Sequence, residues 1–187
     1  IDFIRIAAGY NHSFGLKSDG SLVAWGANDY DQTIIPSPNT GFIDMAAGLG
    51  HSLGLRSDGS IVVWGRNDFG QSNVPPPNAD FIDIAAGWYH SLGLKDDGSI
   101  VAWGYNATGQ TNVPAPNTGF IAIAAGRDYS LGVRVPDSDG DGVDDPDDAC
   151  PNSNLGETVV IDGCDSGVVN HLFEDGCTMA DRIAACA

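Results

Sequence analysis

Twelve residues in the last third of the chain, DSDGDGVDDPDD at positions 137–148, have the spacing of a calcium-binding loop. Ligand positions 1, 3, 5, 7, 9 and 12 of such a loop are held by Asp137, Asp139, Asp141, Val143, Asp145 and Asp148. Carboxylate oxygens and one backbone carbonyl suit Ca²⁺ better than a transition metal, although aspartate at position 12 is shorter than the usual glutamate. We expect this segment to bind Ca²⁺ and to become ordered on binding. The alternative is a solvated acidic linker.

Three histidines, each followed by serine, are the second set that could do chemistry: His12, His51 and His90. Neighbouring residues of a strand point to opposite faces, so an adjacent His-Ser pair is not a base and its nucleophile. No second ligand type recurs at the same spacing, and Tyr129 replaces histidine in a fourth copy. We therefore predict no catalytic residue, and a structural role in which each imidazole bonds to neighbouring backbone.

These histidines belong to an internal repeat of 39 residues that does not drift. FIRIAAG, FIDMAAG, FIDIAAG and FIAIAAG begin at residues 3, 42, 81 and 120. The units are 3–41, 42–80, 81–119 and a partial fourth, 120–134. Trp25, Trp64 and Trp103 recur in the same phase, and we expect them to pack between strands, because large buried area is what a small unit lacks.

Each unit is predicted to form four short β-strands. FIDIAA, HSLGLK and SIVAWG are short stretches rich in residues that favour strands, and an Asp-Gly turn joins the second stretch to the third. GQTNVP is predicted to supply an outer fourth strand, which the proline-rich segment ends. Such a unit is typical of a propeller blade, so the predicted fold is all-β: a partial β-propeller of three full blades and part of a fourth.

The pattern AAGxxHSLGLxxDGSxVxWGxNxxGQ resembles the repeat of the regulator of chromosome condensation (RCC1) family, whose members are seven-bladed β-propellers. The compact unit is most similar to the short-repeat bacterial type, which includes a secreted β-lactamase inhibitor. The resemblance covers residues 1–134. Three and a half units cannot close a seven-bladed ring, so it implies an open arc with an exposed blade edge, which favours self-association.

Two residues between AAG and the histidine differ in every unit, although their neighbours are constant. These slots hold Tyr10-Asn11, Leu49-Gly50, Trp88-Tyr89 and Arg127-Asp128. A loop position that packing leaves free is where a scaffold presents specificity. Aromatic residues at such loops form the partner-binding face of the resembling inhibitor, and interfaces favour Trp and Tyr. Tyr10, Trp88 and Tyr89 are therefore candidate partner-binding residues; the alternative is that they are loop residues partly packed on neighbours.

The acidic segment and the residues that follow it, DSDGDGVDDPDDACPN and then DGC, resemble the bacterial form of the thrombospondin type 3 repeat. In that repeat, Ca²⁺ loops and a nearby disulfide replace a hydrophobic core. The resemblance implies that residues 135–165 form a calcium-binding segment in which Cys150 pairs with Cys164.

The last segment, residues 166–187, is expected to contain a short helix that begins after Thr178 as N-cap. A helical run from Cys177 to Cys186 would separate these two cysteines by about 13 Å, too far for a disulfide. Their pairing therefore stays open, and Cys186 is expected to need a cysteine beyond Ala187.

The net charge of −17, from 25 acidic and 8 basic residues, excludes a row of phosphate contacts and hence nucleic acid as a partner. No apolar run is long enough for membrane insertion. All four cysteines lie in the acidic tail, which favours an oxidising compartment, outside the cell or at its surface.

The predicted function is a non-catalytic module of a secreted bacterial protein that binds an unidentified protein or cell-surface macromolecule and is joined to a calcium-binding spacer. Two alternatives stay open. The repeats are a passive architectural part of a larger secreted enzyme, or they are themselves an enzyme with its site on the propeller face.

Overall fold

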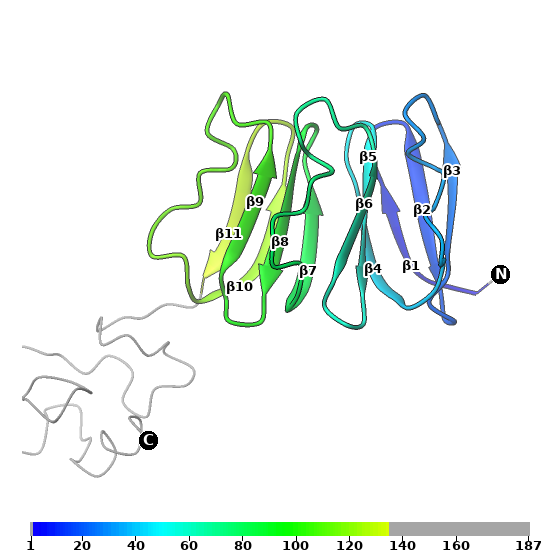
Figure 1. Cartoon of the computed structure of the whole chain (residues 1–187), viewed down its shortest axis with the longest axis horizontal. Helices are drawn as coiled ribbons and strands as arrows, with labels where there is room; N and C mark the ends of the chain where they lie inside the picture. Colours follow the sequence, from blue (N-terminus) through cyan, green and yellow to red (C-terminus); the bar gives the residue numbers. More distant parts are fainter. Residues whose placement is uncertain (1, 135–187) are drawn as a thin grey trace, which may run out of the picture. The chain divides into compact units, whose positions relative to one another are not determined.

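The structure is a computed structural model that describes residues 2–134. These residues form four antiparallel sheets that stand side by side (Figure 1). The strands are β1 Phe3–Ala8, β2 His12–Lys17, β3 Leu22–Gly26, β4 Phe42–Ala47, β5 His51–Arg56, β6 Ile61–Gly65, β7 Phe81–Ala86, β8 His90–Lys95, β9 Ile100–Gly104, β10 Phe120–Ala125 and β11 Ser130–Arg134. The predicted all-β class is confirmed for this part of the chain, in which no helix occurs.

Each repeat unit is one sheet, with its strands paired in sequence order. The first three sheets have three strands each, and the fourth, β10-β11, has two. The register is the same in every sheet: Ser13 lies opposite Trp25, and Ser52 opposite Trp64. The first strands of successive sheets, β1, β4, β7 and β10, lie next to one another. This is the arrangement of three propeller blades and part of a fourth.

The hairpin turn between the second and third strands is the predicted Asp-Gly turn. Gly20 adopts a φ of +77°, a conformation that favours glycine. Asp19 Oδ1 accepts hydrogen bonds from the backbone N–H and the hydroxyl of Ser21, at 2.9 and 2.6 Å, and these bonds lower the pKa of Asp19. The second and third units repeat this turn around Asp58 and Asp97.

The prediction of an outer fourth strand from GQTNVP is wrong. Residues 70–75 and 109–114 form turns and irregular backbone, so the full blades described have three strands each. The reason is that the polar groups of this segment are bonded elsewhere. The carbonyl oxygen of Gln71 accepts from Ser91 Oγ and Trp103 Nε1 of the next blade, and the N–H of Ser72 donates to Asn67 Oδ1. No regular row of backbone groups is left to pair with the third strand.

The hydrophobic core lies between blades. Leu53 and Leu55 of the second blade pack with Phe81, Ile84 and Trp103 of the third. The other two clusters follow the same plan, between the first and second blades and between the third and fourth. A single three-stranded sheet buries little by itself, so each blade is stabilised by the one beside it.

The three repeated tryptophans report on this packing. Trp64 and Trp103 are 8% and 6% exposed, which confirms the predicted packing role, whereas Trp25 is 48% exposed. The difference arises because no sheet precedes β1–β3 among the described residues.

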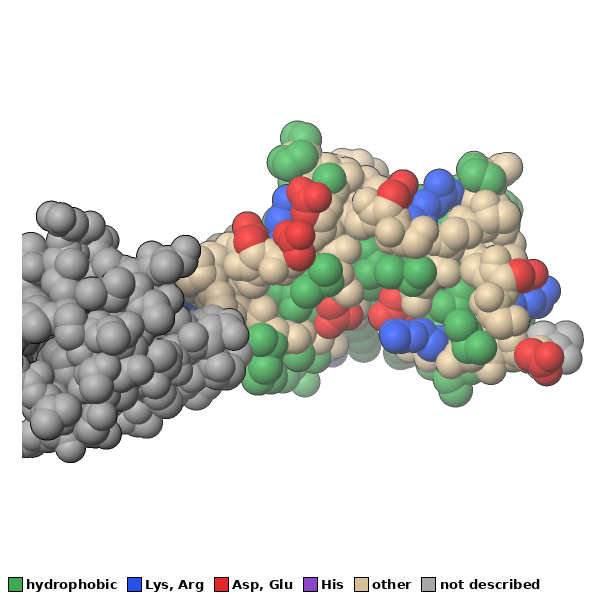
Figure 2. Space-filling model, turned by 90° about the horizontal axis from the view of Figure 1, so that it is seen from below, with side chains coloured by type: hydrophobic (Ala, Val, Ile, Leu, Met, Phe, Trp, Pro, Cys, Tyr) green, Lys and Arg blue, Asp and Glu red, His purple; other side chains and the backbone are tan. Residues whose placement is uncertain are grey.

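The ends of the blades that carry the hairpin turns have a mixed surface (Figure 2), with acidic and basic side chains set among hydrophobic ones. One ion pair, between Arg5 and Asp44 at 2.8 Å, joins β1 to β4. Within residues 2–134 no helix has the length and apolar character needed to cross a membrane.

Candidate partner-binding face

A hydrogen-bond relay links each blade to the next. Nε2 of His12 lies 2.9 Å from Oγ of Ser52, and that hydroxyl donates to the carbonyl oxygen of Gln32 at 2.9 Å. Since the only hydroxyl hydrogen of Ser52 goes to Gln32, the histidine Nε2 must be the donor to Ser52. The same relay recurs as His51, Ser91 and Gln71, and as His90, Ser130 and Gln110.

The histidines are therefore structural. The side-chain partner of each ring is a serine hydroxyl of the next blade, which the prediction of neighbouring backbone did not include. Their rings are buried, and burial lowers the pKa of His12 and His90. For His51, burial together with the two neighbouring histidines lowers the pKa to about 3. At neutral pH these side chains are uncharged.

Histidine and serine thus come within 3.0 Å of each other across blades, the spacing of a general base and its nucleophile. The direction of the bonds argues against that chemistry, because the histidine donates and the serine hydrogen is held by a carbonyl. Ser52 and Ser91 are also 0% exposed, so no substrate reaches them. The pair fixes one blade on the next.

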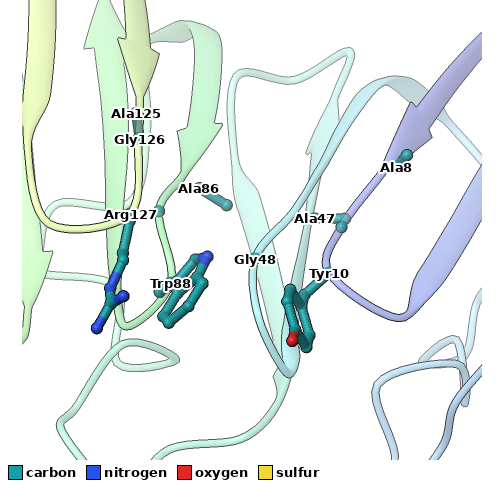
Figure 3. Close-up of a pocket in the computed structure, with 11 residues that line it drawn as sticks. Ala8, Tyr10, Ala47, Gly48, Ala86, Trp88, Ala125, Gly126 and Arg127 are labelled. Carbon is teal, nitrogen blue, oxygen red and sulfur yellow. The ribbon is translucent and has the colours of Figure 1, made fainter.

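Three of the four residues in the first slot position form a row at the ends of the innermost strands; Leu49, after β4, is not part of it. Tyr10 and Trp88 meet edge to face, with ring centroids 5.5 Å apart. The guanidinium carbon of Arg127 lies 4.1 Å from the centre of the Trp88 ring. Figure 3 shows the three side chains on loops of the first, third and fourth units, with Gly48 of the second unit between Tyr10 and Trp88. We call Tyr10, Trp88 and Arg127 the inner row.

Backbone hydrogen bonds hold the loops of the inner row together. The N–H of Tyr10 donates to the carbonyl of Gly48 at 3.1 Å, and the N–H of Trp88 donates to the carbonyl of Arg127 at 3.2 Å. A hollow of about 260 Å³ opens beside the row. Its walls are the row and the Ala-Gly pairs that end the four innermost strands: Ala8, Gly9, Ala47, Gly48, Ala86, Gly87, Ala125 and Gly126.

The residue in the second slot position points away from the hollow. Tyr89 packs against Phe69 and Tyr105, with ring centroids 5.2 and 6.2 Å apart. The guanidinium of Arg66 is sandwiched between Tyr89 and Tyr30, at 5.0 and 4.7 Å from the ring centres. We call Tyr30, Arg66, Phe69, Tyr89 and Tyr105 the outer cluster.

Four members of the outer cluster were not predicted from the sequence: Tyr30, Arg66, Phe69 and Tyr105. The signal was present, because these positions also differ between units. Tyr30 and Phe69 correspond to Thr108, and Arg66 and Tyr105 correspond to Ala27. In the second unit, Phe69 contacts Tyr89, which holds the second slot position of the third unit.

The three predicted partner-binding residues are brought together. Trp88 contacts both Tyr10 and Tyr89, the latter with ring centroids 6.4 Å apart, and so joins the inner row to the outer cluster. Tyr10 is 61% exposed, Phe69 43% and Tyr30 42%. Trp88 and Tyr89 are half-buried, so the alternative of partial packing on neighbours also describes them.

Metal chemistry is not found in the described part of the chain: residues 2–134 contain no group of three or more His, Cys, Asp or Glu side chains that could hold a metal ion. The predicted calcium ligands, the Cys150–Cys164 pair and the predicted C-terminal helix lie outside the described residues.

Comparison with known proteins agrees with this architecture. Residues 3–32, 42–71 and 81–110 match the family described as regulator of chromosome condensation (RCC1) repeat. No curated protein sequence matches the chain.

Among solved structures, Prp20p from Saccharomyces cerevisiae is similar over 72% of this chain and 44% of its own, with a TM-score of 0.62 and 23% identity. The CRINKLY WD40 ectodomain of the Arabidopsis thaliana receptor kinase ACR4 is 30% identical over 72% of this chain and 46% of its own, with a TM-score of 0.56. The ectodomain of the Physcomitrella patens receptor kinase CR4 is 29% identical over 73% of this chain and 37% of its own, with a TM-score of 0.57. This chain thus spans less than half the length of each.

The slots identified above therefore sit in blades of a known kind: the chain carries three RCC1 repeats within residues 3–110, folded as successive blades of an RCC1-like β-propeller.

Proposed function

We propose that this RCC1-like section is a non-catalytic protein-binding module whose partner docks on the inner row and the outer cluster. One observation carries the proposal. Aromatic and arginine side chains gather on one end of the blades, at positions that differ in chemical type from unit to unit, while the buried core positions stay hydrophobic.

The chemistry of this face supports protein binding. Protein interfaces are enriched in Tyr, Trp, Phe and Arg, and their strongest contacts come from such residues. The side chains here already touch one another, as Tyr10 does with Trp88 and Phe69 does with Tyr89. Rings held in place lose less rotamer freedom when a partner binds, which favours affinity.

The relatives support the same class of function. The study of the Prp20p structure describes its binding to Gsp1p and histones, and a second structure shows Kap60 bound to yeast RCC1 (Prp20). Those partners belong to those proteins. For this chain we propose a partner that is a protein or cell-surface macromolecule outside the cell; the likeness to receptor ectodomains and the cysteine-containing tail support that location.

The test is capture by the immobilised chain from culture medium and cell-surface extract of the source organism, read by mass spectrometry. The double variant Trp88→Ala/Tyr89→Ala is expected to lose the captured partner, because it removes the two rings that join the inner row to the outer cluster. The matched control is Trp25→Ala, which removes a tryptophan that is 48% exposed and whose ring neighbour is Phe3, a residue of neither the inner row nor the outer cluster.

Circular dichroism must show that both variants fold. Capture that is equal for the double variant and the wild type rules out the proposed face. Loss of capture with Trp25→Ala alone moves the site to the exposed side of the first blade.

A passive architectural role is the second candidate, and the half-burial of Trp88 and Tyr89 favours it. On that reading the two rings only fill space between loops. Measuring stability and capture for the same variant separates the two roles. A packing role predicts that Trp88→Ala/Tyr89→Ala is less stable than the wild type but captures the same proteins.

We further propose that residues 137–148 bind Ca²⁺ and stiffen the segment that follows the blades. The support is the spacing of oxygen ligands at positions 1, 3, 5, 7, 9 and 12. Titration calorimetry of the EDTA-treated chain with Ca²⁺ is expected to give saturable heat, and the variant Asp137→Asn/Asp139→Asn to lose it. No saturable heat with the wild type would rule out the calcium site.

A further inference from the structure

We infer that the hollow beside the inner row takes a side-chain carboxylate of the partner together with a neighbouring apolar side chain, and that Arg127 binds the carboxylate. This inference rests on the proposed function and adds the chemistry of the partner: an acidic residue next to an aromatic or large aliphatic residue on an exposed loop.

Arg127 supplies the charge. Its side chain is 64% exposed, and its Nε lies 2.9 Å from the carboxylate of Asp128. The ion pair with Asp128 is made through Nε, and within residues 2–134 neither Nη1 nor Nη2 donates a hydrogen bond. A planar guanidinium presents these nitrogens as a fork that matches the two oxygens of a carboxylate. Stacking on Trp88 at 4.1 Å fixes the plane of the fork before any partner arrives.

The rest of the hollow selects for an apolar neighbour. None of its lining residues is acidic, and apart from the inner row they are alanine and glycine only. Tyr10 and Trp88 form an aromatic wall at its open side (Figure 3). Among the lining residues a partner carboxylate therefore meets one cation and no anion; Asp128, outside the lining, contacts Arg127 through Nε. The aromatic wall offers apolar surface to the side chain beside that carboxylate. A partner cation would instead meet Arg127 and be repelled.

The walls are also rigid in a way that keeps the hollow open. A Cβ added at Gly87 would lie 2.1 Å from the ring of His90 and 2.6 Å from the backbone oxygen of Gly126. Gly48 is similarly enclosed by His51 and the backbone oxygen of Gly87. Only glycine fits at these positions, because any larger residue would collide with the buried histidine rings of the relay. The relay therefore keeps the floor of the hollow free of side chains.

The probes are three peptides blocked at both ends, acetyl-GDFG-amide, acetyl-GNFG-amide and acetyl-GDAG-amide, and a fourth, acetyl-GNF, with a free terminal carboxylate. Binding to the ¹⁵N-labelled full chain is followed by NMR at the indole N–H of Trp88 and the amide of Gly126. Because a hydrogen bond between charged groups is stronger than one to a neutral amide, GDFG is expected to bind about tenfold more tightly than GNFG. GDAG is expected to bind more weakly than GDFG, since it lacks the apolar neighbour. Binding of the free-terminus peptide as tight as that of GDFG would assign the carboxylate to a chain end and overturn its assignment to a side chain.

Arg127→Gln is expected to abolish the preference for GDFG over GNFG. Arg127→Lys keeps the charge without the fork, so it is expected to retain a smaller preference. The matched control is Arg134→Gln, which removes another arginine stacked on a ring, 6.0 Å from the centre of Phe120, at the other end of the blade; it should keep the full preference.

Equal binding of GDFG and GNFG to the wild type overturns the inference, and so does a preference that survives Arg127→Gln. Absence of any shift with GDFG at about 10 mM also overturns it, because an anchored pair of side chains should bind in the millimolar range or better. These failures leave the proposed function standing if protein capture still depends on Trp88 and Tyr89. Loss of that dependence instead removes the proposed function itself.

Discussion

The interfaces between blades and the face at the ends of the innermost strands are built from the same 39-residue unit, but they use it in opposite ways. At the interfaces the same residue, or another hydrophobic one, recurs in the same register and is buried, as Phe14, Leu53 and Leu92 are. On the face each unit supplies a different residue: Tyr10, Leu49, Trp88 and Arg127. Packing therefore fixes the interfaces and leaves the loop ends free to vary, so stability and binding should separate between the two regions.

The largest effect should come from truncating an interface residue. Leu92 is 1% exposed, and Leu92→Ala is expected to lower the free energy of unfolding by about 2–5 kcal/mol. Leu131 holds the same position in the fourth unit, where it is 58% exposed, so Leu131→Ala should cost no more than about 0.5 kcal/mol. Guanidinium denaturation followed by tryptophan fluorescence measures both. Equal losses would mean that burial between blades is not what stabilises the protein.

The second effect is a pH dependence of stability that arises at the interfaces, where the histidines are buried. Burial and the neighbouring histidines lower the pKa of His51 to about 3 from an ordinary value of 6.5. The folded protein therefore binds this proton less readily than the unfolded chain. Folding is therefore favoured while His51 is neutral. This contribution to stability is fully present above pH 6.5 and is lost as the pH falls from 6.5 towards 3. Between pH 6.5 and 4.5 the loss should be about 2 kcal/mol for this group alone.

Denaturation midpoints at pH 7.0, 5.5 and 4.5 test this, with His51→Gln as the comparison. The glutamine amide can still donate to Ser91 but does not titrate, so its profile should be flatter. Asp19, Asp58 and Asp97 have a pKa below their usual range, and they contribute only at lower pH. A profile as steep in the variant as in the wild type would assign the pH dependence to other groups.

The contrast between the two regions also explains what could be predicted from sequence. Recurring positions such as Trp64 and Trp103 predicted the blades, their register and the buried interfaces, because packing requires a similar residue at the same place in each unit. The missing fourth strand could not be foreseen from GQTNVP. Its backbone groups bond to Ser91 and Trp103, which are near in space but distant in sequence.

The candidate site was predicted in part for the same reason. Tyr10, Trp88 and Tyr89 were found because they interrupt a constant pattern, and the structure places them in contact. That Tyr10 reaches Trp88 across the intervening unit, past Leu49, depends on side-chain directions that a repeat alignment does not contain. The stacking of Arg127 on Trp88 escaped prediction for the same reason.

A smaller effect should follow from removing the tryptophan hydrogen bond to the carbonyl group at which the relay ends. Trp64 Nε1 donates to the carbonyl oxygen of Gln32 at 2.9 Å, and Trp64→Phe removes this bond. The expected cost is about 1–1.5 kcal/mol in the free energy of unfolding, since a buried bond is lost. Trp25 has no such partner among the described residues and is 48% exposed, so Trp25→Phe should be nearly neutral. Thermal denaturation of the pair is the measurement, and similar costs would show that the bond to Gln32 contributes nothing.

The smallest effect concerns the face, and it is best measured as a coupling. Trp88→Ala and Tyr10→Ala should each cost little stability, because both side chains are at least partly in solvent. A double-mutant cycle should still show a coupling of about 0.5 kcal/mol, since the rings meet edge to face at 5.5 Å. A coupling of zero would mean that the two rings move independently before binding. A positive coupling means that they are already ordered in the free protein, so less freedom is lost when a partner docks. A contact that contributes almost nothing to folding can therefore contribute to affinity, and this is how the face can vary between units without cost to the blades beneath it.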